Sequence, residues 1–102
     1  MATLYITEFT NLGRDTASLI VPAAGQLPAT EQIVTIGVSS VQSATLNPAT
    51  CLVRLHNDSI CSVLFGVNPT ATASSMRMAA DQTEYFTVTP GLGFKVAVIG
   101  NV

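Results

Sequence analysis

The sequence predicts an all-β fold, an antiparallel β-sandwich that is jelly-roll-like and has about eight short strands. Runs of β-branched and aromatic residues recur along the chain, and Gly, Pro, Asn, Ser and Thr separate them. No window repeats apolar residues at the i, i+3, i+4, i+7 spacing for three turns, so no long helix is expected. The chain of 102 residues is expected to form a single domain over 1–102.

The first half of the chain contains three expected strands. "LYITEF" (4–9) alternates apolar and polar residues, and "SLIV" (18–21) is a short run that ends at a proline. "PAAGQLPAT" (22–30) contains two prolines and is expected to be an irregular connection. "QIVTIGV" (32–38) is rich in β-branched residues, whereas "SSVQSATLNPAT" (39–50) is a polar link.

The second half is more regular. The strands "CLVRLH" (51–56) and "ICSVLFG" (60–66) flank "NDS", which has the residues of a hairpin turn. The remaining elements, each bounded by turn residues, are a loop at 68–75, strands at 76–78 and 83–88, a turn at 90–93 and a last strand at 94–99.

Alternation along a strand assigns side chains to faces, because successive residues point to opposite sides of the sheet. In 51–56 the core face takes Cys51, Val53 and Leu55, and the other face takes Leu52, Arg54 and His56. Phe86 and Val88, and likewise Phe94, Val96 and Val98, are expected to point inward. With "NDS" at the tip of a hairpin, Leu55 would lie opposite Cys61, and Cys51 opposite Phe65.

The candidates for chemistry are His56, Asn57, Asp58 and Cys61, with Cys51 nearby. These residue types could form a Cys/His nucleophile pair or a zinc site, and zinc needs three or four converging ligands. The alternation separates His56 from both cysteines, so the segment is interpreted as a turn and core residues. We therefore expect no catalytic, cofactor-binding or metal-binding residues, and no enzyme activity.

The two cysteines are expected to be reduced and buried. In the hairpin register they are about four positions apart, which disfavours a disulfide. The acidic residues Asp81 and Glu84 lie in a turn before a strand, where solvated carboxylates are common. The "PGLG" turn (90–93) lacks the Lys and Ser/Thr of a phosphate-binding loop.

Composition restricts the partners. Only 4 Lys and Arg residues are present and the net charge is −2, so no basic surface is available for nucleic acid. The N-terminal residues lack the basic and apolar regions of a signal peptide, and no apolar run is long enough for a membrane span. Synthesis in a cytosol is therefore expected, where cysteines stay reduced.

The surface is expected to be polar but weakly charged. Charged residues make up 10% of the chain, while it contains 13 Thr and 8 Ser. Hydroxyl and methyl groups cost less to desolvate than ions, so such a surface suits a protein that is covered by a partner. An ordinary extracellular β-domain, in which Thr-rich strands are also common, is the alternative.

Three segments in residues 53–99 carry a resemblance to small proteins encoded by tailed bacteriophages and prophages. They are "R-L-H-x-D" (Arg54–Asp58), "F-G-x-x-P-T-A-T" (Phe65–Thr72), and "E-Y-F-x-V-x-P-G" (Glu84–Gly91) leading into "K-V-A-V-I" (Lys95–Ile99). Among such virion proteins, the sequence is most similar to the capsid decoration, or cement, class. The first fifty residues are less distinctive.

This resemblance implies a structural protein that binds across neighbouring major capsid subunits on the capsid exterior, after synthesis in the bacterial cytoplasm. It also implies a homo-oligomer, a trimer or a dimer, without cofactor, nucleic acid or membrane. The alternative is another virion component: a head fibre, an adaptor or a host-glycan-binding module. Residues 1–12, as an N-terminal arm, and residues 22–30 are the expected contacts with the shell.

Overall fold

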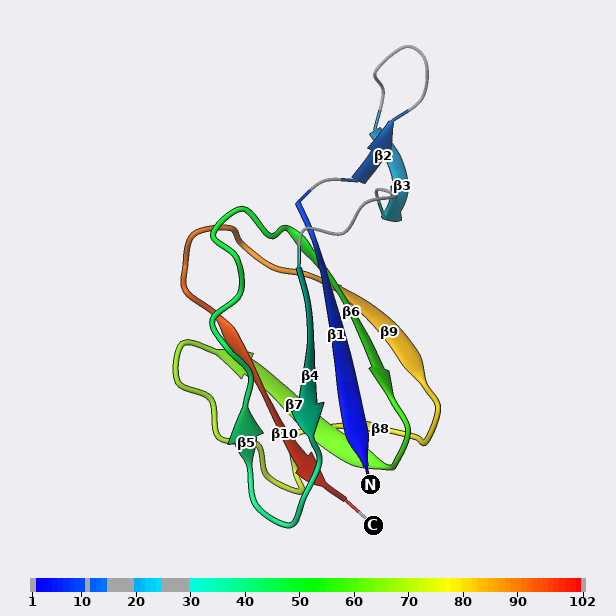
Figure 1. Cartoon of the computed structure of the whole chain (residues 1–102), viewed down its shortest axis with the longest axis vertical. Helices are drawn as coiled ribbons and strands as arrows, with labels where there is room; N and C mark the ends of the chain where they lie inside the picture. Colours follow the sequence, from blue (N-terminus) through cyan, green and yellow to red (C-terminus); the bar gives the residue numbers. More distant parts are fainter. Residues whose placement is uncertain (1, 11, 15–19, 25–29, 102) are drawn as a thin grey trace.

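The computed structural model describes residues 2–10, 12–14, 20–24 and 30–101. Within them the chain forms ten β-strands and no helix. Eight strands build two four-stranded antiparallel sheets, and two more form a separate ribbon (Figure 1). The all-β class expected from the sequence is confirmed. In the part of the chain that the structure describes, no helix is long and apolar enough to cross a membrane.

The two sheets draw strands from distant parts of the chain. The first sheet has the order β4-β1-β6-β9 and contains β4 (Thr30–Thr35), β1 (Thr3–Phe9), β6 (Leu52–Asn57) and β9 (Thr83–Thr87). The second sheet has the order β5-β10-β7-β8 and contains β5 (Val41–Gln42), β10 (Lys95–Gly100), β7 (Cys61–Gly66) and β8 (Met76–Met78). The ribbon pairs β2 (Leu12–Arg14) with β3 (Ile20–Ala24), beyond the end of β1 (Figure 1).

One hydrophobic cluster receives side chains from both sheets. Its members are all buried: Leu4, Ile6, Val34, Ile36, Leu46, Val53, Leu55, Cys61, Val63, Met78, Val96 and Val98. Phe65, Phe86, Val88 and Phe94 pack against this cluster. The inward faces predicted for residues 51–56, 83–88 and 94–99 are therefore confirmed for Val53, Leu55, Phe86, Val88, Phe94, Val96 and Val98, but not for Cys51, which lies outside this cluster. Burial of each aliphatic side chain contributes roughly 1.5–3 kcal/mol.

The predicted hairpin at residues 51–66 is wrong. β6 pairs with β1 and β9 in the first sheet, whereas β7 pairs with β10 and β8 in the second. The "NDS" segment is thus a corner between sheets, and the expected pairs Leu55–Cys61 and Cys51–Phe65 do not form. The reason is that Asp58 bonds to the start of β1 and Asn57 bonds to the segment before β9, which directs the chain from one sheet into the other.

The N-terminal segment is not an arm over residues 3–9. These residues form β1, which lies between β4 and β6 in the middle of the first sheet. Leu4 and Ile6 are completely or almost completely buried in the core. Alternation that buries one face of a strand gives that strand a core role, and this outweighs its position at the chain terminus. Residues 1 and 11 lie outside the described residues.

Three smaller expectations also need correction. Residues 22–24 belong to β3 and residue 30 to β4, so the irregular connection expected at 22–30 is wrong for these four residues. Residues 25–29 lie outside the described residues. The strand expected at 32–38 begins earlier and ends at Thr35. The polar link at 39–50 contains the two-residue strand β5. Residues 18 and 19 of the strand expected at 18–21 are also outside the described residues.

Candidate functional site

The structure separates the residues that the sequence offered for chemistry. His56 lies on the outer face of the first sheet, where its Nδ1 is 2.7 Å from the hydroxyl of Thr83. Its ring packs beside that of Tyr5 at a centroid distance of 6.3 Å. Its Nε2 is 4.0 Å from the carboxylate of Asp81, whose side chain is 80% exposed, so solvent screens this pair. No cysteine shares this face with His56.

Asn57 and Cys61 are buried on the opposite side. The Nδ2 of Asn57 donates to the carbonyl of Ser59 at 2.6 Å, to the carbonyl of Ala79 at 2.7 Å and to the Sγ of Cys61 at 3.5 Å. Its Oδ1 accepts from the main-chain N–H of Gln82 at 3.2 Å. Burial raises the pKa of the Cys61 thiol above 9.0. A thiol that stays protonated is a poor nucleophile, so this pair has a structural role.

Asp58 holds the start of β1. Its Oδ1 accepts a hydrogen bond from the main-chain N–H of Thr3 at 2.6 Å, and its own N–H donates to the carbonyl of Thr3 at 3.2 Å. The carboxylate is therefore used within the fold. Across the described residues, no group of three or more His, Cys, Asp and Glu side chains could hold a metal ion.

The remaining candidates from the sequence, Cys51, Asp81 and Glu84, do not form a common site either. Cys51 precedes β6 and is only partly buried, so the expectation that both cysteines are buried is wrong for Cys51; both thiols are free. Glu84 points inward and accepts from the Nε2 of Gln82 at 2.8 Å, whereas Asp81 is exposed. These two carboxylates therefore do not face each other across a cleft.

Glu8 is a buried carboxylate that the sequence analysis missed. Its Oε1 accepts from the N–H of Asn47 and from the hydroxyl of Thr50, each at 2.7 Å, and its Oε2 accepts from the Nε2 of Gln32 at 3.1 Å. Its place in the alternation was a usable signal, because it follows Leu4 and Ile6 on the inward face of β1. All its bonds go to the protein, so Glu8 ties the segment before β6 to the first sheet.

The chain itself covers part of the outer face of the second sheet. Ala97 and Ser62 lie on this face, yet both are fully buried. Residues 67–75, between β7 and β8, are held against it by bonds from the Nε2 of Gln42 to the Oδ1 of Asn68 and to the carbonyl of Pro69, each 2.8 Å. At the other end, the Nδ2 of Asn101 donates to the hydroxyl of Ser62 at 2.7 Å and to the carbonyl of Ala73 at 3.2 Å.

The first sheet, in contrast, has an open outer face. Its strand register places side chains in two neighbouring rows: Ile33, Tyr5, His56 and Thr83, then Glu31, Thr7, Arg54 and Tyr85. Ile33 is 66% exposed, Tyr85 55% and Tyr5 44%. We call these eight residues the open face. It combines three large apolar or aromatic groups with two threonine hydroxyls and with Glu31, Arg54 and His56. Exposed aromatic groups and arginine are typical of a protein-binding surface.

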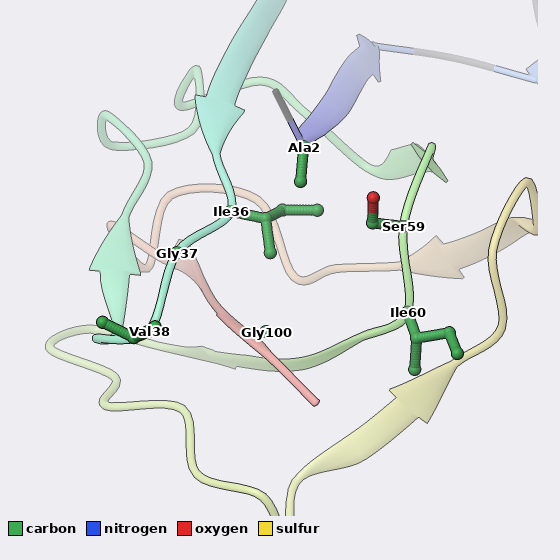
Figure 2. A pocket seen from close by; sticks show the side chains of 7 residues that line it. All are labelled: Ala2, Ile36, Gly37, Val38, Ser59, Ile60 and Gly100. Atoms are coloured by element: carbon green, nitrogen blue, oxygen red, sulfur yellow. The ribbon is translucent and has the colours of Figure 1, made fainter. Parts of the chain in front are cut away.

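A hollow of about 420 Å³ lies at the end of the two sheets near both chain termini (Figures 1 and 2). Its lining is mostly aliphatic or glycine: Ala2, Ile36, Gly37, Val38, Ser59, Ile60 and Gly100. Gly100 donates its N–H to the carbonyl of Gly37 at 2.8 Å, and a Cβ at residue 100 would lie 3.1 Å from that oxygen. The lining residues include no titratable side chain, so this hollow can accept an apolar group but cannot perform acid–base chemistry.

No protein-family model, curated protein or solved structure matches this chain.

Proposed function

We propose that this chain is a structural virion protein that decorates and stabilises a phage capsid from its exterior, as a homo-oligomer that binds across neighbouring major capsid subunits. The resemblance of residues 53–99 to phage proteins supports the class. The observation that carries the proposal is the open face: an uncovered sheet surface with Ile33, Tyr5 and Tyr85 exposed. In this proposal the fold is a jelly-roll-like sandwich, which the many connections between the two sheets support.

The proposed mechanism is stabilisation by mass action. A protein that binds only the assembled lattice stabilises it by RT ln(1 + [L]/Kd) per site, which is about 2.7 kcal/mol when the free protein is at 100 times its Kd. No chemical step is needed, in agreement with the internal bonding of Glu8, Asn57 and Asp58. The N-terminal segment contributes through the outer side chains of β1, Tyr5 and Thr7, and not as a free arm.

The binding is expected to tolerate salt. The open face includes Arg54, Glu31 and His56, but exposed ion pairs contribute little, and salt screens them further as the Debye length falls from about 10 Å at 0.1 M to about 3 Å at 1 M. Burial of the apolar groups of Ile33 and Tyr85 is not screened, and excluded salts strengthen it.

The test is cosedimentation of the full chain with empty capsids of the phage or prophage that encodes it. Ile33→Lys places a charge on the open face, and Leu64→Lys makes the same change on the outer face of the second sheet, where Leu64 is 41% exposed. We expect Ile33→Lys to weaken binding at least about tenfold, since a buried unpaired charge costs several kcal/mol, and Leu64→Lys to bind as wild type. Release by salt alone, or equal binding by both variants, would contradict the proposal.

The second candidate is a host-glycan-binding module. Tyr5 and Tyr85 support it, because both rings are exposed on one face and sugars stack on aromatic rings. The two candidates differ in the partner: a glycan-binding module would bind host cells and lose this binding in Tyr5→Ala and Tyr85→Ala variants, without binding to empty capsids.

A further inference from the structure

The strand β9 forms an edge of the first sheet that no other described strand pairs. It bonds to β6 on its other side, and two bonds fix which of its residues face β6. The N–H of Asn57 donates to the carbonyl of Gln82 at 3.3 Å, and the N–H of Val88 donates to the carbonyl of Cys51 at 3.1 Å. Alternation in an antiparallel ladder then directs the N–H and C=O groups of Thr83, Tyr85 and Thr87 away from β6.

This edge lacks most of the features that usually protect an exposed strand. Residues 83–87 contain no Pro, Gly or Lys, and the structure shows no bulge between β6 and β9. The one protective feature present is the inward-pointing carboxylate of Glu84, which accepts a hydrogen bond from Gln82 of the same chain. Of the other three edges of the two four-stranded sheets, β5 and β8 have only two and three residues. The edge at β4 lies beside β5, and the N–H of Ala44 donates to the side chain of Gln32 there.

The residues on the free edge are complementary to themselves under two-fold symmetry. With the axis at Tyr85, an antiparallel pair places Tyr85 opposite Tyr85 of a second copy, and Thr83 opposite Thr87. The N–H and C=O groups then match at three residue pairs, which gives about six main-chain hydrogen bonds. Threonine faces threonine and tyrosine faces tyrosine, so no like charges meet, and Glu84 lies opposite Phe86.

We propose that two copies of this chain pair through β9 about a two-fold axis at Tyr85, which joins the first sheets into one antiparallel sheet of eight strands. The inference rests on the proposed function in one respect: that function includes a homo-oligomer, and the β9 pairing makes this oligomer a dimer and not a trimer. Edge pairing of this kind is isologous and closes after two copies. It also joins the two open faces into one surface with both Tyr85 rings at its centre.

The test uses a proline that removes an outward N–H without breaking the fold. The N–H of Thr87 points away from β6, so Thr87→Pro leaves the β6–β9 ladder intact and blocks the free edge. Thr87→Ala keeps the N–H and is the matched control. Thr35→Pro makes the same change at the β4 edge. The N–H of Ile36 donates to the carbonyl of Ala2, so by alternation the N–H of Thr35 points away from β1.

The measurement is the mass of the free full-length protein by light scattering and sedimentation, from low to high micromolar concentration and without capsids. We expect a dimer for wild type, Thr87→Ala and Thr35→Pro, and a dissociation constant about 30-fold higher or more for Thr87→Pro. A monomer or trimer in wild type, or a dimer in folded Thr87→Pro, would overturn the proposal. Loss of the dimer in Thr35→Pro alone would assign the contact to β4 and overturn it as well.

Hydrogen exchange on wild type gives a second test that does not depend on a folded variant. The amides of Thr83, Tyr85 and Thr87 have no partner across the free edge in a single copy, so their protection should rise with protein concentration. The outward amides of Ile33 and Thr35 are the internal control and should not change. Equal behaviour of the two edges would overturn the proposal. Because no capsid is present, the capsid-binding function can fail while the dimer holds, or the reverse.

Discussion

The side-chain amide of Asn57, which is fully buried, donates a hydrogen bond to the main-chain carbonyl of Ala79, 2.7 Å away. This bond joins the end of β6 to the segment between β8 and β9, and so connects the two sheets at one corner. The same amide also bonds to Ser59 and Gln82. A single buried side chain thus satisfies three main-chain groups that no strand ladder pairs.

Asn57→Ala should lower the free energy of unfolding by about 2–4 kcal/mol, because it removes the three main-chain hydrogen bonds of a fully buried side chain. Urea denaturation at constant m-value measures this loss. His56→Ala is the control one residue away: its side chain lies on the outer face, so the loss should stay below about 1 kcal/mol. Equal losses in the two variants would show that the corner is held by other contacts.

Glu8→Gln should also destabilise the fold, by about 1–3 kcal/mol. The carboxylate accepts one hydrogen bond each from Asn47, Thr50 and Gln32. Glutamine has an NH2 group in place of one carboxylate oxygen, so at least one of these three donors would face another donor. Glu31→Gln makes the same change on the exposed face of β4 and should alter stability by less than about 0.5 kcal/mol. Denaturation of both variants in parallel measures the difference; an unchanged midpoint in Glu8→Gln would contradict a structural role.

Deletion of residues 2–10 should unfold the protein. It removes β1 from the middle of the first sheet, together with the buried side chains of Leu4 and Ile6. Far-UV circular dichroism and hydrogen exchange measure the loss of β-structure. Tyr5→Thr is the control, because it changes only the outer face of β1 and retains a β-branched residue. A folded deletion variant would mean that β4 and β6 can pair without β1.

The sequence was sufficient for most of the longer strands of the two sheets but not for their partners. Alternation located β1, β6, β9 and β10 and assigned Val53, Val96 and Phe86 to the core, because the period of two is a local property. Pairing is not local. Asn57 and Asp58 have the composition of a hairpin turn, and the sequence alone cannot show that their polar groups bond to Ala79 and Thr3 instead.

The open face could not be predicted from the sequence for a related reason. Alternation identified Tyr85 as outward, but equivalent outward positions in the second sheet, such as Ala97, are covered by residues 67–75. Which of the two sheets residues 67–75 cover depends on contacts between segments far apart in the chain. Glu8, in contrast, could have been predicted from the sequence. A carboxylate on the same inward face as Leu4 and Ile6 indicates a buried polar network.

Cys61 should make the stability of the fold sensitive to alkaline pH. Burial raises the pKa of its thiol above 9.0, with the hydrogen bond from Asn57 acting in the opposite direction and the nearby charge of Asp58 reinforcing the rise. A group whose pKa is higher in the folded state binds its proton longer there. The stability it contributes is therefore complete below the unfolded pKa and is lost as pH rises through the folded value.

Comparison of wild type with Cys61→Ala, in reductant, isolates this effect from other groups that titrate at high pH. At neutral pH wild type should be the more stable protein, because truncation leaves a cavity in the core, and the difference should shrink as the pH rises above 9.0. In a Cys51→Ala background the remaining thiol should react with a thiol reagent at least about 100-fold more slowly than in unfolded protein, since labelling requires local opening. A stability difference that is constant with pH, or fast labelling of Cys61, would mean that this thiol reaches solvent and is not part of the closed core.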